Sequence, residues 1–412
     1  MRRAGAILMY AEKRSCLIGL LLLQMICICL LQGCSDKDTN LEAVEQPVET
    51  VSDNSEVSAD EAAAEGTVNE IDTDPTMMNV ETEEAVSYSS IPAMTDDSEE
   101  DVRAVVDEQD KVLRTEDGRI IVDLIMFMGQ SNMSGTGGNA KYAPEVPEGH
   151  GYEFRAISDP TRLYPIEEPF GLYENTPGAI EDMPIAKNGS LVSAFANKYY
   201  ELTGVPVVAV SASSGGRDTD YWMSKKVVDD FSERQKRAQV WLESNNYYIR
   251  KQYVIWLQGE SDAEDGLTTE QYNQNMDNII RPLFIGGVQK VFMITPGRTL
   301  TGKYFYDSIV YAQIKMCRDS GYYALATTVL NSVSTEYMID EFHYNQSVLN
   351  VTGSEAAESA AYYTLNRKEK CLYNYRDENV YIPDGFEYTE DEMNVTPVDH
   401  NNNGDFVRYE NG

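Results

Sequence analysis

IIVDLIMFMGQSNM, residues 120–133, is the stretch that decides the fold class of this chain. Its first nine residues are nearly all apolar, as in a strand buried on both faces of a parallel sheet. Four more short apolar runs follow downstream, with helical spacing between them, at residues 205–211, 253–258, 291–295 and 323–330. Strands that alternate with helices predict an α/β fold, a doubly wound (flavodoxin-like) three-layer α/β/α domain with a five-stranded parallel sheet.

Polar or glycine-rich segments follow four of these strands, three of them directly and the fourth past a short loop, at the sheet edge where ligands bind. Ser131 lies in the Gly-Gln-Ser-Asn-Met block after the first strand, and Gly215-Gly216-Arg217 follows the second. Gln258-Gly-Glu260 ends the third strand, and Asp340 and His343 follow the fifth. Together these segments hold a nucleophile, a base, an orienting acid and backbone donors for an oxyanion, which a Ser-His-Asp hydrolase requires.

Histidine is scarce, which narrows the choice of a base. The chain has three, and His150 and His400 lie in polar loops typical of the surface. Only His343 has a carboxylate three residues before it, at a spacing that brings two side chains together. His343 is therefore the candidate base, with Asp340 as its partner.

Two serines compete for the role of nucleophile. Ser261 lies in Gly-Glu-Ser-Asp-Ala, residues 259–263, which approximates the nucleophile elbow of α/β-hydrolases. That fold brings its acid and its histidine from separate loops, whereas Asp340 and His343 are three residues apart. The spacing favours Ser131.

The four segments together resemble the SGNH/GDSL hydrolase superfamily and, within it, the sialate O-acetylesterase-like branch, carbohydrate esterase family six. The resemblance covers about residues 120–365 and implies an SGNH-type serine esterase that needs no cofactor and no metal. Its substrate would be an O-acetylated carbohydrate, either sialic acid or an acetylated polysaccharide. The implied triad is Ser131, His343 and Asp340.

The resemblance also implies an oxyanion site and the residues that support it. The donors would be the backbone N–H groups of Ser131 and of Gly216 or Gly215, with the side chain of Gln258. The supporting side chains would be those of Gln130, Asn132 and Glu260. Two positions depart from the branch: Arg217 stands where threonine is usual, and Glu341-Phe342 stands where Gly-Ile is usual.

Two other functions fit these residues less well than an esterase. A non-catalytic glycan-binding surface lipoprotein could use the same fold, but loss of a triad residue would then be expected, and all three are present. A lipase or thioesterase would need an apolar groove for an acyl chain, whereas the segments after the strands are polar.

The first 34 residues read as an export signal. Basic residues precede an almost wholly apolar run from Ser15 to Leu31, and Leu31-Gln-Gly-Cys34 resembles the bacterial lipobox. We therefore expect a lipid on Cys34 that anchors the chain, outside the cytoplasm, to the bacterial cell membrane. An uncleaved transmembrane anchor is the alternative, since the apolar run is near the shortest length that can span.

Composition sets the remaining boundaries. The chain carries a net charge of −35, which argues against binding nucleic acid. Residues 35–112 are expected to form a disordered acidic tether. Residues 35–110 contain 24 Asp or Glu but only two basic residues, and such a segment has too few apolar side chains to fold. The esterase domain would span 113–370, and 371–412 would be a polar extension. Outside the signal only Cys317 and Cys371 remain, and these two could form a disulfide. The sequence has no Cys-x-x-Cys or His-rich pattern with the spacing of zinc ligands.

Overall fold

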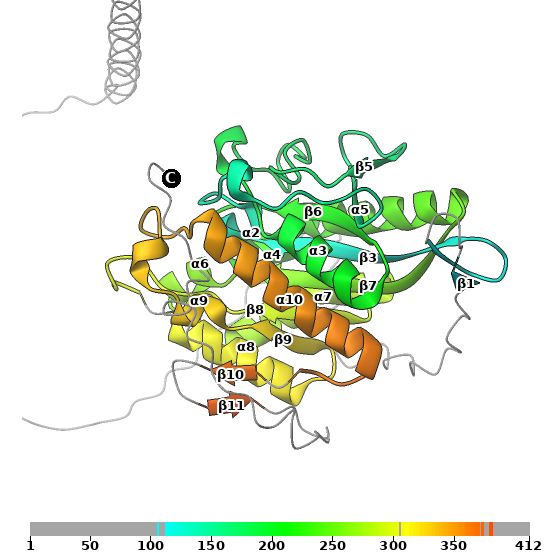
Figure 1. Cartoon of the computed structure of the whole chain (residues 1–412). Helices are drawn as coiled ribbons and strands as arrows, with labels where there is room; N and C mark the ends of the chain where they lie inside the picture. Colours follow the sequence, from blue (N-terminus) through cyan, green and yellow to red (C-terminus); the bar gives the residue numbers. More distant parts are fainter. Residues whose placement is uncertain (1–104, 107–111, 305, 371, 375–378, 382–412) are drawn as a thin grey trace, which may run out of the picture. The chain divides into compact units, whose positions relative to one another are not determined.

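The computed structural model describes residues 105–106, 112–304, 306–370, 372–374 and 379–381 (Figure 1). The predictions for the signal with Cys34, for nearly all of the tether and for most of the C-terminal extension lie outside these residues. Cys317 is buried, whereas Cys371 is not described, so the predicted pairing stays a prediction. Among the described helices, none is both long and apolar enough to cross a membrane.

A largely parallel sheet forms the centre of the molecule, with the strand order β6-β3-β7-β8-β9 in its middle. All five predicted strands occur here and pair in parallel. Their bounds are Ile120–Gly129 for β3, Val207–Ser213 for β6, Tyr247–Leu257 for β7, Lys290–Ile294 for β8 and Tyr323–Thr327 for β9.

The sheet is wider than the five strands that the sequence predicts. A further parallel strand pairs with β6, and three short antiparallel strands extend the sheet, giving nine strands in all. They are β1 (Val105–Val106), β2 (Leu113–Arg114), β4 (Gly151–Phe154) and β5 (Leu163–Pro165). The sequence misses them because none exceeds four residues or has a continuous apolar run. A separate hairpin pairs β10 (Leu372–Asn374) with β11 (Asn379–Tyr381).

Four of the longer helices lie between the five central strands, where the sequence has helical spacing. Several short helices begin just after strands end. The longer ones are α3 (Val192–Thr203), α5 (Lys225–Ser244), α7 (Thr269–Ile285), α8 (Asp307–Asp319) and α10 (Gln346–Asn366). The short ones are α2 (Ser131–Ser134), α4 (Thr219–Met223), α6 (Glu260–Glu264) and α9 (Val329–Ser332), with 3₁₀ turns η1 (Ala140–Tyr142), η2 (Pro184–Ala186) and η3 (Thr335–Tyr337).

The last helix, α10, begins at Gln346, directly after its capping residue. The Asn345 side chain accepts hydrogen bonds from the backbone N–H groups of Ser347 and Val348 and so caps it. Gly353 lies inside α10, where a glycine favours ending a helix. A Cβ atom there would lie 2.2 Å from the carbonyl oxygen of Leu191, so this glycine lets α10 pack closely on α3.

Alternate side chains of β3 enter two separate hydrophobic clusters. Leu124 and Met126 pack with apolar residues of α5, α7 and α8, whereas Ile125 and Phe127 pack with residues of α3 and α10. Successive residues of a strand point to opposite faces of the sheet, so helices cover both faces. Figure 1 shows α3 and α10 side by side across the near face.

Two strand ends meet where β3 turns into α2. Gly129 has a φ of +144°, and a Cβ atom there would lie 2.0 Å from the carbonyl oxygen of Leu257. Only glycine tolerates both the backbone conformation and this close approach. The carboxyl ends of β3 and β7 are thereby held together, and Ser131 becomes the first residue of α2.

Candidate active site

One cavity of about 580 Å³ lies among the segments that follow the strands. Four of these segments contribute to its wall, together with part of the loop before α3. The lining residues are Gln130, Ser131, Asn132, Thr136, Glu181, Asp182, Met183, Ala186, Gly215, Gly216, Arg217, Glu260, Ser261, Glu264, Phe342 and His343. The topology therefore gathers most of the predicted site residues around one opening.

The closest pair of predicted catalytic side chains is His343 with Asp340. The ring nitrogen Nδ1 of His343 lies 2.9 Å from Oδ1 and 2.8 Å from Oδ2 of Asp340. Oδ1 also accepts the backbone N–H groups of Phe342 and His343, each at 2.9 Å. An ionised carboxylate only accepts hydrogen bonds, so Nδ1 carries the hydrogen and Nε2 is left as the basic nitrogen.

The charge of Asp340 is maintained by these contacts. Burial alone would raise its pKa, but the hydrogen bonds from His343 and the backbone outweigh burial and lower the pKa. The side chain of Asp340 is 47% exposed and that of His343 is 15% exposed. At neutral pH the carboxylate can therefore orient the imidazole and stabilise its cation.

Ser131 lies in the same cavity wall as His343. Among the described residues, its hydroxyl and its backbone N–H have no hydrogen-bond partner, and no hydrogen bond joins it to His343. Such bonds are often long in enzymes without substrate. A Cβ atom on Gly137 would lie 2.7 Å from Cβ of His343, so this glycine lets the loop of His343 pack beside the segment that follows α2.

The two adjacent glycines differ in their availability as oxyanion donors. The N–H of Gly215 donates to Oδ1 of Asp182 at 2.6 Å, whereas the N–H of Gly216 has no partner among the described residues. A Cβ atom on Gly215 would lie 3.4 Å from Cβ of Ser131, so the glycine turn is next to this serine. The backbone N–H groups of Ser131 and Gly216 are thus both open.

The structure does not bring Gln258 into the cavity wall. Its side chain is fully buried, and Nε2 donates to the carbonyl oxygen of Arg217 at 3.0 Å and to the carboxylate of Asp262. Its Oε1 accepts from Tyr272. The sequence could not show this, because the direction of the amide depends on Asp262. In this conformation Gln258 holds the backbone of Arg217 and has no free N–H for an oxyanion.

Asn132 and Glu260 connect three of the segments in the cavity wall. Nδ2 of Asn132 donates to Oε1 of Glu260 at 3.0 Å and to the carbonyl oxygen of Phe342 at 3.2 Å. Burial raises the pKa of Glu260, although the hydrogen bond from Asn132 opposes this. Its Oε2 and the Oε1 of buried Gln130 have no partner among the described residues.

Other residues near the site either line the cavity or are buried in the packing around it. Ser261 also lines the cavity, so location alone does not separate the two serines. Trp222 and Tyr344 are buried and serve packing, whereas Phe342 lines the cavity and is 40% exposed. Asp182 was not predicted, because it lies in a loop that carries no motif. Nowhere in the described part of the chain do three His, Cys, Asp or Glu side chains gather as metal ligands would.

A family model described as "Carbohydrate esterase, sialic acid-specific acetylesterase" matches residues 121–361. None of the curated protein sequences matches this chain. The similar solved structures include the following three. An Arabidopsis thaliana protein is 19% identical, with a TM-score of 0.43, over 59% of this chain and 98% of that one. NanS is 12% identical, with a TM-score of 0.42, over 60% and 98%. The carbohydrate acetylesterase XAC1771 of Xanthomonas citri is 16% identical, with a TM-score of 0.38, over 61% and 60%.

Proposed function

Since this chain belongs to the carbohydrate esterase family of sialic acid-specific acetylesterases, we propose that it removes O-acetyl groups from a glycan through a triad of Ser131, His343 and Asp340. The family makes it a carboxylic ester hydrolase that acts on acetylated carbohydrate. The observation that carries the proposal for the triad is the hydrogen bond between Asp340 and His343, because His343 and Ser131 line the same cavity.

The proposed reaction starts with proton transfer. Nε2 of His343 takes the hydroxyl proton of Ser131 as Oγ attacks the carbonyl carbon of the acetyl ester. The resulting imidazolium gives its proton to the departing sugar oxygen, which leaves an acetyl group on Ser131. Water then attacks this acetyl-enzyme, again with His343 as base, and acetate and the free serine are formed. Asp340 keeps the imidazole in the required tautomer throughout.

The oxyanion of each tetrahedral intermediate requires hydrogen-bond donors that are in place before reaction. We assign this role to the backbone N–H groups of Ser131 and Gly216, because both lack partners in the described structure. Gly215 could join them only if Asp182 released its N–H. The Gln258 side chain could donate to the oxyanion only if it turned away from Asp262. We therefore assign it the role of holding the backbone of Arg217 in place. Each donor contributes about 10²–10³-fold to such reactions.

The proposal is tested by acetate release from O-acetylated glycans by the full-length protein. Wild type should release acetate, and His343→Ala should lose nearly all of this activity because the general base is gone. His150→Ala is the matched control, since the ring of His150 stacks on Tyr200 at 4.1 Å and does not line the cavity. Activity retained by His343→Ala would contradict the mechanism. A wild type that binds glycans without hydrolysis would favour the non-catalytic alternative.

We further propose that the enzyme acts outside the cytoplasm, as a lipoprotein. The lipobox-like sequence that ends at Cys34 and the acidic segment after it support this placement. Such a segment would hold the catalytic domain away from the membrane, because like charges extend a chain. Cys34→Ala should abolish labelling by a radioactive fatty acid and alter the retention of the protein in the membrane fraction. Unchanged labelling would contradict lipidation and favour an uncleaved transmembrane anchor.

A further inference from the structure

Arg217 is a cavity-lining cation that is held in place but has no anionic partner. Its Nε donates to Oγ of Ser214 at 3.3 Å, and its guanidinium carbon lies 4.7 Å from the centre of the Tyr221 ring. Its carbonyl oxygen accepts from Gln258 at 3.0 Å. Within the described residues, neither terminal nitrogen of Arg217 has a hydrogen-bond or ion-pair partner.

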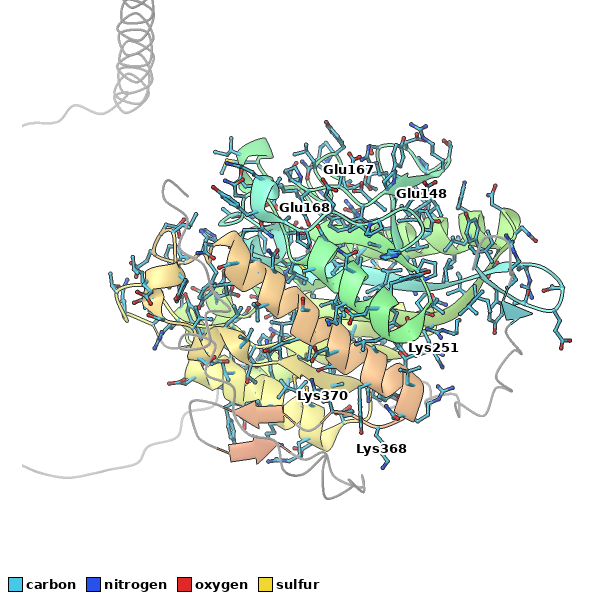
Figure 2. All side chains as sticks on the ribbon, viewed as in Figure 1. Glu148, Glu167, Glu168, Lys251, Lys368 and Lys370 are labelled. Atoms are coloured by element: carbon cyan, nitrogen blue, oxygen red, sulfur yellow. The ribbon has the colours of Figure 1, made fainter. Side chains whose placement is uncertain are left out.

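The chain has 68 acidic and 33 basic residues, and other arginines of the domain form ion pairs. Buried Arg234 pairs with Asp230, and Arg250 pairs with Asp123. Arg217 is the one Lys or Arg in the lining of the cavity. None of the three lysines labelled in Figure 2, Lys251, Lys368 and Lys370, lines the cavity.

Four carboxylates line the cavity wall, and three of them accept hydrogen bonds from neighbouring residues, whereas that of Glu181 has no partner among the described residues. Asp182 accepts from the N–H of Gly215 and, at 2.5 Å, from Oγ of Ser134. Glu264 accepts from the hydroxyl of Tyr306 at 3.1 Å, and Glu260 accepts from Asn132. Arg217 is therefore the position in this largely acidic wall at which an anionic substrate group would be attracted. A substrate carboxylate would therefore be drawn to one place, and the orientation of the sugar would be fixed.

Phe342 adds an exposed apolar side chain to the same cavity wall. Its N–H donates to Asp340, and its carbonyl oxygen accepts from Asn132. In the strand order, β6 precedes Arg217 on one side of β3, and β9 precedes the loop of Phe342 on the other side. An acetylated sugar between them could place its ring on Phe342 and a charged substituent at Arg217.

From these observations we infer that Arg217 binds the carboxylate of an O-acetylated sugar acid and that the enzyme prefers such substrates to neutral acetylated sugars. This inference rests on the proposed esterase function and selects among its substrates. The terminal nitrogens of a guanidinium match a carboxylate with two parallel hydrogen bonds. Either a sialic acid or a uronic acid would supply this group.

The test compares acetate release from matched pairs of substrates by the full-length protein. One pair is the methyl glycoside of 9-O-acetyl-N-acetylneuraminic acid and its carboxamide, and the other is an acetylated methyl glucuronide and its carboxamide. For at least one pair, kcat/KM should be about 10-fold or more higher for the acid, as expected for hydrogen bonds to a charged group. The pair that shows this preference identifies the kind of sugar acid.

Three variants connect the preference to the guanidinium. Arg217→Gln should bring the acid-to-amide ratio of kcat/KM close to one, and Arg217→Lys should keep part of the ratio because charge remains without the planar fork. Arg162→Gln is the matched control, since this arginine is 66% exposed, pairs with Asp159 and lies outside the cavity wall. Circular dichroism melting of each variant checks that it folds.

The outcomes separate this inference from the proposed function. A wild-type ratio near one, or a preference that Arg217→Gln leaves unchanged, would overturn the inference. Hydrolysis of 4-nitrophenyl acetate without hydrolysis of either sugar acid would also overturn it but would leave the esterase intact. Failure of wild type on every ester, 4-nitrophenyl acetate included, would overturn the proposed function itself.

Discussion

Replacing Asp340 by asparagine should be more damaging than replacing it by alanine, although asparagine is the closer mimic. Oδ1 of Asp340 accepts two backbone N–H groups, so the amide oxygen of an asparagine must occupy that position. The amide nitrogen would then face Nδ1 of His343 from the position of Oδ2, which is 2.8 Å away. Two donors cannot face each other, so Nδ1 would lose its hydrogen and Nε2 would carry it.

That tautomer cannot take the proton of Ser131. In enzymes with this triad, the corresponding acid-to-amide change lowers the rate by about 10⁴-fold. An alanine imposes no tautomer and should cost less, about 10²–10³-fold, as when a general base loses its orientation. The lowered pKa of Asp340 means that its carboxylate is ionised at neutral pH, so the difference should persist across the range where wild type is active.

The measurement is kcat/KM for 4-nitrophenyl acetate, with thermal melting to check folding. Glu341→Gln is the matched control in the same loop, because its Oε1 accepts from Thr301 at 2.5 Å and an amide oxygen can do the same. It should stay within about threefold of wild type, as surface changes usually do. An Asp340→Asn variant that is more active than Asp340→Ala would refute the reasoning about the tautomer.

Three further substitutions test the packing around the site. Gly137→Ala should lower kcat/KM by about 10²-fold, because the new Cβ would be 2.7 Å from Cβ of His343 and would displace the base. This loss of activity should exceed what the change in melting temperature explains, and unchanged activity would contradict the contact. Burial raises the pKa of Glu260, so the folded state binds its proton more tightly than the unfolded state. Stability therefore falls as pH rises from the ordinary pKa of a glutamate toward the raised one. Glu260→Gln should reduce this fall in melting temperature with rising pH, and an identical slope would count against it. Arg234→Met should cost about 3–5 kcal/mol in urea unfolding, because it leaves the buried carboxylate of Asp230 unpaired; a loss below about 1 kcal/mol would show that the pair is unimportant.

The sequence predicts most of the fold because its central strands are long and apolar. Each of the five predicted strands occurs, and the segments after four of them line one cavity. The pair of Asp340 and His343 was also predictable, since a spacing of three residues is a local relation. The edge strands were not, because strands of two to four residues have no periodicity to detect.

The rest of the site depends on contacts between distant segments, which one sequence does not reveal. Asp182 binds the N–H of Gly215 across a separation of 33 residues, and no motif marks it. The amide of Gln258 is turned by the carboxylate of Asp262, which removes it from the predicted oxyanion site. The sequence shows that Arg217 and Phe342 differ from the residues usual in the family, but only the structure places both in the cavity wall.

The most direct test of the account is to compare Ser131→Ala with Ser261→Ala, because both serines line the cavity. With acetate release from an O-acetylated sugar as the assay, Ser131→Ala should lower kcat by about 10³-fold or more, since no acetyl-enzyme can form. The double variant Ser131→Ala/His343→Ala should be scarcely worse, because triad members act as a unit. Ser261→Ala should keep most of the wild-type activity. If instead Ser261→Ala is inactive and Ser131→Ala retains activity, the assignment of the nucleophile and the proposed mechanism are both contradicted.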